Sequence, residues 1–222
     1  MKLNRRITIL LIITLNILCY SQFSGGSGTV EDPYQIATAE HLNNIRYYLT
    51  SSFIQIADID LGVAPWNEGE GWDPIGDYNM SDPTRSFRGN FDGNYFKIAN
   101  MSINRPLESY LGLFGSIENS DFRSINLVNF KIIGGAAIGG IVAISYLSFI
   151  SNCNSEGYIE GHSELGLLMY FFEGYNIINC HTKGEIISND GGWIGGLVSM
   201  CNADSVKNCS VEVMISSNKN MI

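Results

Sequence analysis

Short hydrophobic segments recur along the second half of the chain, and glycine, asparagine and serine separate them. Many of their residues are β-branched, as in Ile186-Ile187 and in Val211-Glu212-Val213-Met214-Ile215. No stretch in this part keeps apolar residues at the 3.6-residue spacing of a helix for long enough to form one. The pattern therefore predicts an all-β chain of short strands and tight turns.

Two sequence motifs repeat in phase. The first is a tetrapeptide with asparagine in its third position, whose copies begin at residues 98, 124, 150, 177 and 206, which are 26, 26, 27 and 29 residues apart. The second is an apolar segment around a glycine, and its copies contain Gly112, Gly139, Gly166 and Gly195. One such repeat cannot enclose a core, whereas stacked repeats can. We therefore predict a β-helical solenoid with its coils over residues 98–222.

The asparagine of each tetrapeptide predicts a corner of this solenoid. Apolar residues lie on both sides of it, three positions apart, as Ile150 and Cys153 do, and a straight strand cannot turn both inward. Asparagine tolerates the left-handed conformation of a corner, and its amide can bond to the asparagine one coil away. Solvent-exposed turn asparagines are the alternative. The predicted ladder lies inside one corner and consists of Asn100, Asn126, Asn152, Asn179 and Asn208.

Residues 22–97 follow different patterns. Thr38 is a suitable N-cap for an amphipathic helix over residues 39–49, which would cover the first coil. Residues 53–61 alternate between apolar and polar and predict an early strand, whereas residues 62–86 show no periodicity and predict a loop that leaves the wall. The predicted divisions are an N-terminal cap over 22–52, first strands and an acidic loop over 53–97, and repeat coils over 98–222.

Residues 1–21 have the three-part form of a secretory signal. Basic residues precede an apolar run over residues 7–18, and Cys19 and Ser21 are small residues at −3 and −1 to a cut before Gln22. The run is short for a membrane span of about 20 residues. We expect a secreted or cell-surface protein with no stable membrane insertion after cleavage, and we keep an uncleaved anchor and lipid attachment at Cys19 as alternatives.

Composition excludes one class of partner. The chain has 13 lysines and arginines against 22 aspartates and glutamates, a formal net charge of −9 at pH 7. A chain this acidic repels phosphate backbones, so we expect no nucleic-acid partner. The 24 glycines and the low charged fraction of 16% favour tightly turned strands over a helical bundle.

Three cysteines occupy the same place in successive tetrapeptides. In-register residues of stacked strands hold their Cβ atoms about 4.8 Å apart and parallel, against about 3.8 Å in a relaxed disulfide. Cys153, Cys180 and Cys209 therefore predict a buried stack of thiols. Cys201 lies off this register, and both a free thiol and one disulfide remain open for it.

Candidate catalytic groups are few. No zinc-binding spacing occurs, and His41, His162 and His181 are far apart in sequence. Asp58 and Asp60 share one face of an alternating strand, as the carboxylates of a β-helical polysaccharide enzyme do, but no acid and base at matched separation are identifiable. We predict a protein without catalytic activity or cofactor, with a carbohydrate-active hydrolase or lyase as the alternative.

The acidic loop is a candidate cation site. Hard oxygen ligands on a flexible loop can hold Ca²⁺, although the ligand spacing of an EF-hand is absent. A calcium site and a solvated acidic loop are the two interpretations of this segment. The candidate ligands are Glu68, Glu70, Asp73 and Asp77, with Asp82 nearby.

Aromatic residues recur at turns and strand ends, where flat rings can bind sugars or protein partners. Covering the solenoid wall is the alternative role. These residues are Trp66, Trp72, Tyr78, Tyr110, Tyr146, Tyr158, Tyr170, Tyr175 and Trp193.

Several motifs resemble bacterial surface proteins that carry GLUG repeats. The resemblance runs from about residue 25 to residue 213, and its motifs are Gly25-Gly26-Ser27-Gly28-Thr29, Trp72-Asp73-Pro74-Ile75-Gly76, Phe91-Asp92-Gly93-Asn94, Tyr110-Leu111-Gly112-Leu113-Phe114-Gly115 and Gly195-Gly196-Leu197-Val198. It implies a right-handed parallel β-helix outside the cell, of the kind found in adhesin-like proteins and, as an accessory, beside immunoglobulin A-specific metallopeptidase domains. The third copy of the glycine motif, Leu165-Gly166-Leu167-Leu168, lacks the second glycine. Leucine-rich repeats are the rival solenoid, and their spaced leucines are missing here.

The sequence thus predicts an exported, non-catalytic β-helical module for surface display, adhesion or a stalk. We expect its partners to be host or matrix proteins or glycans. A purely structural fragment is a third possibility. No capping element follows the last repeat, which predicts an open last coil and either further domains or pairing with another chain.

Overall fold

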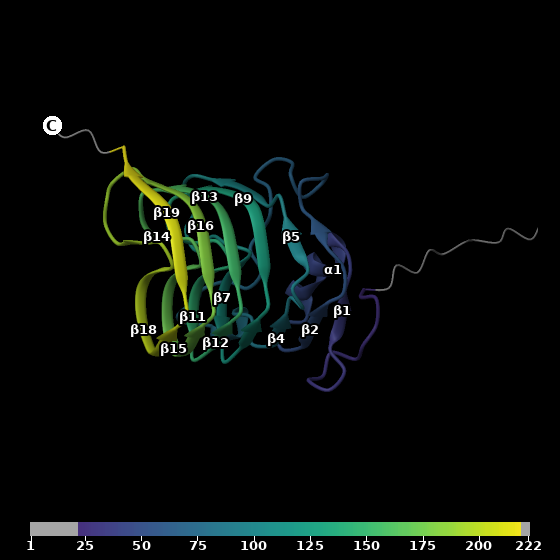
Figure 1. Ribbon diagram of the computed structural model, residues 1–222. Helices are drawn as coiled ribbons and strands as arrows, with labels where there is room; N and C mark the ends of the chain where they lie inside the picture. The colour runs from purple at the N-terminus through teal and green to yellow at the C-terminus, as the bar shows by residue number, and fades with distance from the viewer. Residues whose placement is uncertain (1–21, 219–222) are drawn as a thin grey trace, which may run out of the picture.

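The computed structural model describes residues 22–218 and shows a right-handed parallel β-helix of about five coils. In Figure 1 the coils stack along one axis, with the N-terminal end at the right and the C-terminal end at the left. The paired strands run parallel to their neighbours. The fold class predicted from the repeats is confirmed.

Three sheets form the wall of the solenoid. The first contains β1 (Tyr34–Ile36), β2 (Ser52–Gln55), β4 (Asn90–Asp92), β7 (Phe114–Glu118), β8 (Asp121–Arg123), β11 (Val142–Tyr146), β12 (Phe149–Ser151), β15 (Met169–Ile178) and β18 (Val198–Lys207). The second contains β10 (Ala136–Gly139), β14 (Ser163–Gly166) and β17 (Ile194–Gly195). The third contains β3 (Ile59–Asp60), β5 (Lys97–Ala99), β6 (Ser102–Arg105), β9 (Asn126–Gly134), β13 (Asn154–Gly161), β16 (His181–Ser188) and β19 (Ser210–Ser217).

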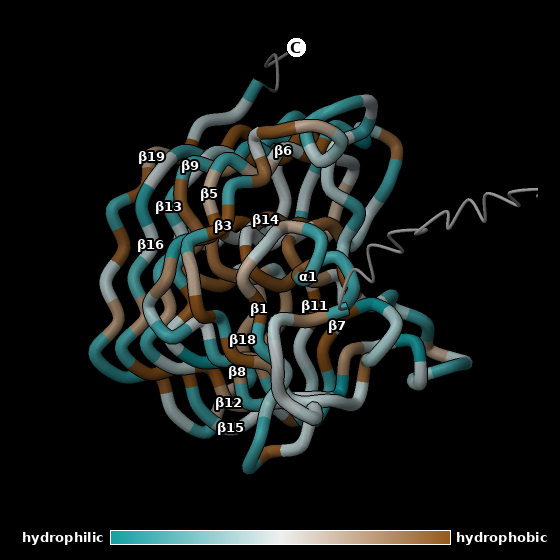
Figure 2. Tube along the Cα trace, turned by 90° about the vertical axis from the view of Figure 1, so that its right-hand side faces the viewer, coloured by the Kyte–Doolittle hydropathy of each residue, from teal (hydrophilic) through white to brown (hydrophobic). Residues whose placement is uncertain are grey.

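Equivalent residues of successive coils lie side by side and fill the interior in columns. In the third sheet, one column consists of Ile103, Ile132, Ile159, Ile186 and Ile215. The first four of these side chains are buried, and each contributes about 1.5–3 kcal/mol through burial. Figure 2 looks along the solenoid axis and shows the coils enclosing one interior, with hydrophobic and hydrophilic residues alternating along the wall.

Phenylalanine side chains fill the N-terminal half of the core. Neighbouring ring centroids lie 4.8 to 6.1 Å apart, mostly edge to face or tilted, which is the arrangement that aromatic quadrupoles favour. The five buried rings belong to Phe53, Phe87, Phe91, Phe114 and Phe122.

A short helix covers the N-terminal end, as the sequence predicts. Helix α1 (Ala39–Asn44) begins at Thr38, whose Oγ1 accepts a hydrogen bond from the backbone N–H of His41 at 3.1 Å. The 3₁₀ turn η1 (Ile45–Tyr47) follows, so the α-helix is shorter than the apolar spacing suggests. Leu42 and Ile45 are fully buried over the first coil.

The acidic loop is attached to the wall over part of its length, which corrects the prediction of a simple excursion. Trp72 is buried, and its Nε1–H donates to the backbone oxygen of Leu113 at 3.1 Å. Ile75 forms a β-bridge with Phe114, and Phe87, the residue that follows the loop, forms one with Ile117. Individual apolar residues attach the loop to the wall. Because they are not regularly spaced, the loop shows no alternation of apolar and polar residues from which a strand could be predicted. The 3₁₀ turn η2 (Pro83–Arg85) lies in its exposed part.

The last described coil exposes residues that face the interior in earlier coils. Val211 and Ile215 of β19 are about half exposed, whereas Thr182 and Ile186, their neighbours in β16, are buried. No described strand pairs with the outer edges of β18 and β19. Among residues 22–218, no helix combines the length and the apolar character that a membrane crossing requires. The predicted signal segment lies outside the described residues.

Candidate functional site

An asparagine ladder marks the corner between the first and third sheets. Asn152, Asn179 and Asn208 each adopt a left-handed backbone with φ near 54°. The Nδ2 of Asn179 donates to the Oδ1 of Asn152 at 3.0 Å, and the Nδ2 of Asn208 donates to the Oδ1 of Asn179 at 3.2 Å. These three residues are brought together as the sequence analysis expects.

The other two predicted members lie elsewhere, which is a correction. Ser124, with φ of 55°, occupies the ladder position of its coil, and Asn126 lies two residues beyond it at the start of β9. Buried Phe122 and Ile125 flank Ser124 three positions apart, so packing rather than the asparagine sets the register. Asn126 accepts instead from the Nδ2 of Asn154 at 2.9 Å.

Asn100 belongs to a separate pair at another corner. Its Oδ1 accepts a hydrogen bond from the Nδ2 of Asn129 at 2.5 Å, and its own Nδ2 donates to the Oδ1 of Asp60 at 2.8 Å. The ladder also lies at the outer surface rather than inside the corner, since Asn179 and Asn208 are exposed. The apolar residues on either side of each ladder asparagine fill the interior at this corner, so the asparagine side chain points toward solvent.

The predicted thiols are stacked behind this corner. Backbone hydrogen bonds from the residues that follow them align Ile125, Cys153, Cys180 and Cys209 in successive coils. Cys153 and Cys180 are buried, Cys209 is partly exposed because its coil is the last one described, and all of the described cysteines are free. Burial raises the pKa of the Cys153 thiol well above its usual value.

Cys201 has no disulfide partner in the described part of the chain. It is exposed on β18 beside Phe172, in an interior column that no described coil covers.

The repeat glycines form a structural column. Gly139, Gly166 and Gly195 are in register, and the backbone N–H of Gly139 donates to the oxygen of Leu111, next to Gly112. A Cβ atom on Gly139 would lie 1.9 Å from the backbone oxygen of Val142. These positions therefore need glycine because the chain doubles back closely between the second and first sheets.

Arginines separate the candidate calcium ligands. Asp73 pairs with Arg46 at 2.5 Å and with Arg105 at 3.5 Å, and Glu70 pairs with Arg105 at 3.3 Å. Asp77 pairs with Arg85, and Glu68 joins none of these ion pairs. Among residues 22–218, no group of three or more histidine, cysteine, aspartate and glutamate side chains is arranged to hold a metal ion. The structure does not bring the four carboxylates into one site.

Asp58 and Asp60 accept structural hydrogen bonds from the backbone. Asp58 accepts a hydrogen bond from the backbone N–H of Lys97, and Asp60 accepts one from that of Gly62, both at 2.8 Å. The hydrogen bond from Asn100 lowers the pKa of Asp60, so its carboxylate is held ionised as an acceptor.

Each of the three histidines contacts a residue other than a histidine. His162 Nδ1 lies 2.9 Å from Asp190, and His181 Nδ1 lies 2.6 Å from the hydroxyl of Ser210. The Nδ1 of His41 accepts from the backbone N–H of Ala37 at 3.3 Å.

A groove on the outer wall of the solenoid was not predicted from the sequence. It has a volume of about 690 Å³ and crosses β4, β8, β12 and β15. Phe149 and Tyr175 stack within it with ring centroids 4.5 Å apart and an interplanar angle of 16°. We call it the aromatic groove, and its principal lining residues are Asn90, Asn119, Asp121, Phe149, Tyr175 and Asn176.

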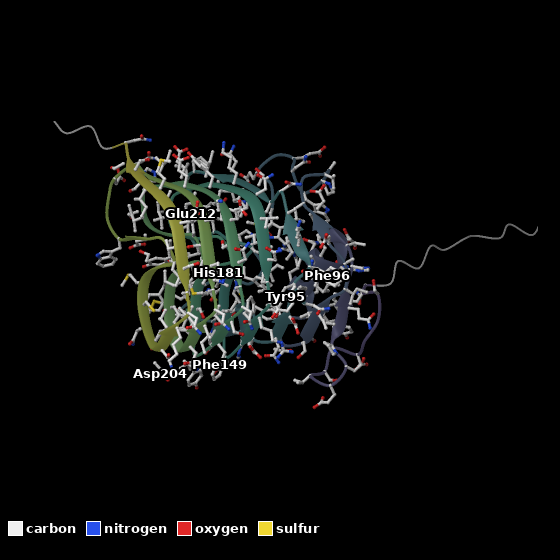
Figure 3. All side chains as sticks on the ribbon, in the orientation of Figure 1. Tyr95, Phe96, Phe149, His181, Asp204 and Glu212 are labelled. Atoms are coloured by element: carbon white, nitrogen blue, oxygen red, sulfur yellow. The ribbon has the colours of Figure 1, made fainter. Side chains whose placement is uncertain are left out.

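Strand register explains how these residues meet. Asn90, Asp121, Phe149 and Asn176 occupy one outward-facing column, because Phe91, Phe122, Ile150 and Ile177 beside them face the core. Figure 3 shows Phe149 projecting outward at the lower edge of the solenoid. The alternation around Ile150 is the sequence signal that identifies Phe149 as exposed.

A second aromatic surface lies over β11 and β15, where Tyr78 from the acidic loop meets the wall. Its ring centroid is 4.9 Å from that of Tyr110 and 6.3 Å from that of Tyr146, and Tyr146 lies 5.3 Å from Phe171. Burial raises the pKa of Tyr110 and Tyr146 above the usual value of a phenol. We call these four residues, together with Tyr170, the tyrosine cluster.

The other candidate aromatics divide between core and surface. Trp72 is part of the core, with Trp66 packed against it at 5.8 Å between ring centroids. Tyr158 donates to Glu160 at 2.8 Å and has Lys131 over its ring, and burial with the Glu160 contact raises its pKa to about 12. Trp193 is exposed near the last described coil.

Comparisons with known proteins give partial likenesses. No family model matches the chain. A protein of Evansella cellulosilytica, provisionally named a Gly-rich membrane protein, is 38% identical over 141 residues, which are 61% of this chain and 16% of that protein. Halomucin of Haloquadratum walsbyi is 31% identical over 151 residues, which are 65% of this chain and 2% of that protein. This chain therefore matches only a small part of each relative's length.

One solved structure is also similar. It is a Bacteroides ovatus protein provisionally named an immunoglobulin A1 protease, and it shares 18% identity with a TM-score of 0.45. The likeness covers 90% of this chain and 82% of that one.

Proposed function

We propose that this chain is an exported, non-catalytic β-helical module that is displayed at or outside the cell surface and binds other molecules there. The aromatic groove carries this proposal. Stacked, exposed rings and polar side chains lie together on the outer wall of a solenoid whose interior is closely packed. Exposed apolar groups gathered in one concave feature are typical of an interaction site.

The names of the two relatives support an extracellular or cell-surface location for this protein. The name of one describes a membrane protein and the other is a halomucin, and the first 21 residues of this chain have the form of an export signal. We further propose that the repeats are of the GLUG type, on the block Phe91-Asp92-Gly93-Asn94 and the in-register glycines.

The chemistry of the groove favours binding without turnover. A glycoside hydrolase of the usual kind needs two carboxyl groups about 5 to 9.5 Å apart across the scissile bond. In the described part of the chain, Asp121 is the single carboxylate among the groove's lining residues, and Arg123 Nη1 lies 3.1 Å from its Oδ2.

Cell fractionation tests the proposal. The full chain is expressed in a bacterium that processes secretory signals, beside a matched chain that lacks residues 1–21. We expect the full chain to start at Gln22 and to be digested by protease added to intact cells, while the shortened chain stays protected. Retention of the full chain inside the cell with Met1 in place would contradict export.

An activity assay tests the non-catalytic part. The purified protein is incubated with soluble polysaccharides, and we expect no new reducing or unsaturated sugar ends. Turnover that is lost in Asp121→Asn or Asp60→Asn would establish a carbohydrate-active enzyme instead.

A further inference from the structure

We propose that the aromatic groove binds a neutral carbohydrate chain, with Phe149 and Tyr175 as the stacking surface and the neighbouring amides as hydrogen-bonding groups. This inference deepens the proposed function, since display outside the cell is what would present the groove to a glycan. It assigns a ligand class to a surface for which the comparisons give none.

The two rings form a pre-organised surface. Phe149 is 45% exposed and Tyr175 is 39% exposed, although the in-register neighbours of Phe149, Asp121 and Asn176, are polar. They stack on one another at 4.5 Å, so neither ring needs to be ordered when a ligand arrives. A sugar ring presents an apolar C–H face, and that face packs on an aromatic ring as other apolar groups do.

The polar groups beside the rings suit hydroxyl groups. The side-chain amides of Asn119 and Asn176 make no hydrogen bond with any other described residue, and each offers two donors and an acceptor. Asn90 is held in place by both neighbouring strands, because its Oδ1 accepts from the backbone N–H of Asp121 at 3.1 Å and its Nδ2 donates to the Oγ of Ser52 at 3.3 Å. The groove therefore combines an apolar surface with amides that can each donate and accept.

Charge selects a neutral ligand. Arg123 lies between Asp121 and Asp92, with its Nη1 3.1 Å from the first and its Nε 2.9 Å from the second, so the cation is already balanced by two carboxylates. The groove offers no unpaired cation to a sulfated or uronic polysaccharide, and the chain's net charge of −9 opposes a polyanion.

The dimensions suit a short oligosaccharide. The column from Asn90 to Asn176 crosses four strands, and three strand spacings of about 4.8 Å give about 14 Å along the solenoid axis.

Binding assays with matched variants test the proposal. The mature protein is titrated by calorimetry and affinity electrophoresis against a panel of soluble neutral polysaccharides, namely mixed-linkage glucan, xylan, mannan and galactan. The variants are Phe149→Ser, Tyr175→Ser and Asn176→Ala. Tyr47→Ser is the control, because Tyr47 is a 71% exposed aromatic residue on the N-terminal cap, away from the groove. Circular dichroism and thermal melts confirm that each variant is folded.

We expect the wild-type protein to bind at least one member of the panel. Either ring variant should weaken binding about tenfold or more, the amide variant by a smaller factor, and Tyr47→Ser should leave it unchanged. Binding to no member of the panel, or binding that none of the groove variants weakens, would overturn the glycan assignment. The fractionation experiment tests export independently of this result. If the protein is exported but binds only a protein from which the glycans have been removed, the proposed function stands and the glycan assignment is refuted.

Discussion

Asn179 is the central residue of the asparagine ladder and combines two separable contributions. Its side chain donates to Asn152 and accepts from Asn208, and its backbone holds φ at 54°. The two hydrogen bonds lie at the surface, so each contributes no more than about 1 kcal/mol. The left-handed backbone is also unfavourable for most residues other than glycine and asparagine. In alanine it lowers the free energy of unfolding by about 1 kcal/mol or more.

We predict that Asn179→Ala lowers the free energy of unfolding by about 2 kcal/mol. Asn179→Gly should lower it by about half as much, because glycine loses the same hydrogen bonds but adopts positive φ without strain. Urea unfolding followed by circular dichroism gives both values. An alanine variant as stable as the wild type would show that the ladder contributes nothing to stability.

The strands show which parts of the fold their sequences predict. Gly139, Gly166 and Gly195 recur in phase because a close approach of backbone permits no other residue, so their spacing predicts the coils directly. Asparagine is less restrictive, since Ser124 serves at the same corner, and the asparagine spacing therefore misplaces the ladder by two residues in that coil.

The candidate site was less predictable than the coils. Tyr175 was among the aromatic residues recognised in the sequence, but its partner Phe149 lies 26 residues earlier and meets it only through the register of β12 and β15. The burial of Trp72 could not be predicted from the sequence either. Trp72 belongs to a loop without hydrophobic periodicity, and it joins the core through its own contacts alone.

The turn between the second and first sheets gives a prediction at the level of the element. Gly139→Ala would place a Cβ 1.9 Å from the oxygen of Val142 and 2.6 Å from the Cα of Met169, so the backbone of two coils must move. We expect a loss of about 3 kcal/mol or more in the free energy of unfolding. Gly69→Ala is the control, because its Cβ meets nothing within 4 Å and only its φ of 60° is strained, which costs about 1 kcal/mol. Equal losses in the two variants, measured by urea unfolding, would refute the steric explanation.

The whole molecule is a stack in which each coil is stabilised chiefly by its two neighbours. At the N-terminal end α1 takes the place of a neighbour, with Leu42 and Ile45 buried on the first coil. At the other end the last described coil has a neighbour on one side only, and the inward-facing Val211 and Ile215 are 52% and 48% exposed. Local stability should therefore fall along the axis toward β18 and β19.

Hydrogen exchange measured by mass spectrometry on the purified protein tests this gradient. We expect peptides from β18 and β19 to exchange their amide hydrogens at least tenfold faster than peptides from β9 and β13, because the outer edges of the last strands lack a described partner and their opening exposes little additional apolar surface. Dilution over a hundredfold range is the control. Protection of β19 equal to that of β13 at every concentration would contradict the gradient. Protection that disappears on dilution would instead show that a second copy covers the exposed face of Val211 and Ile215, since only an association between molecules depends on concentration.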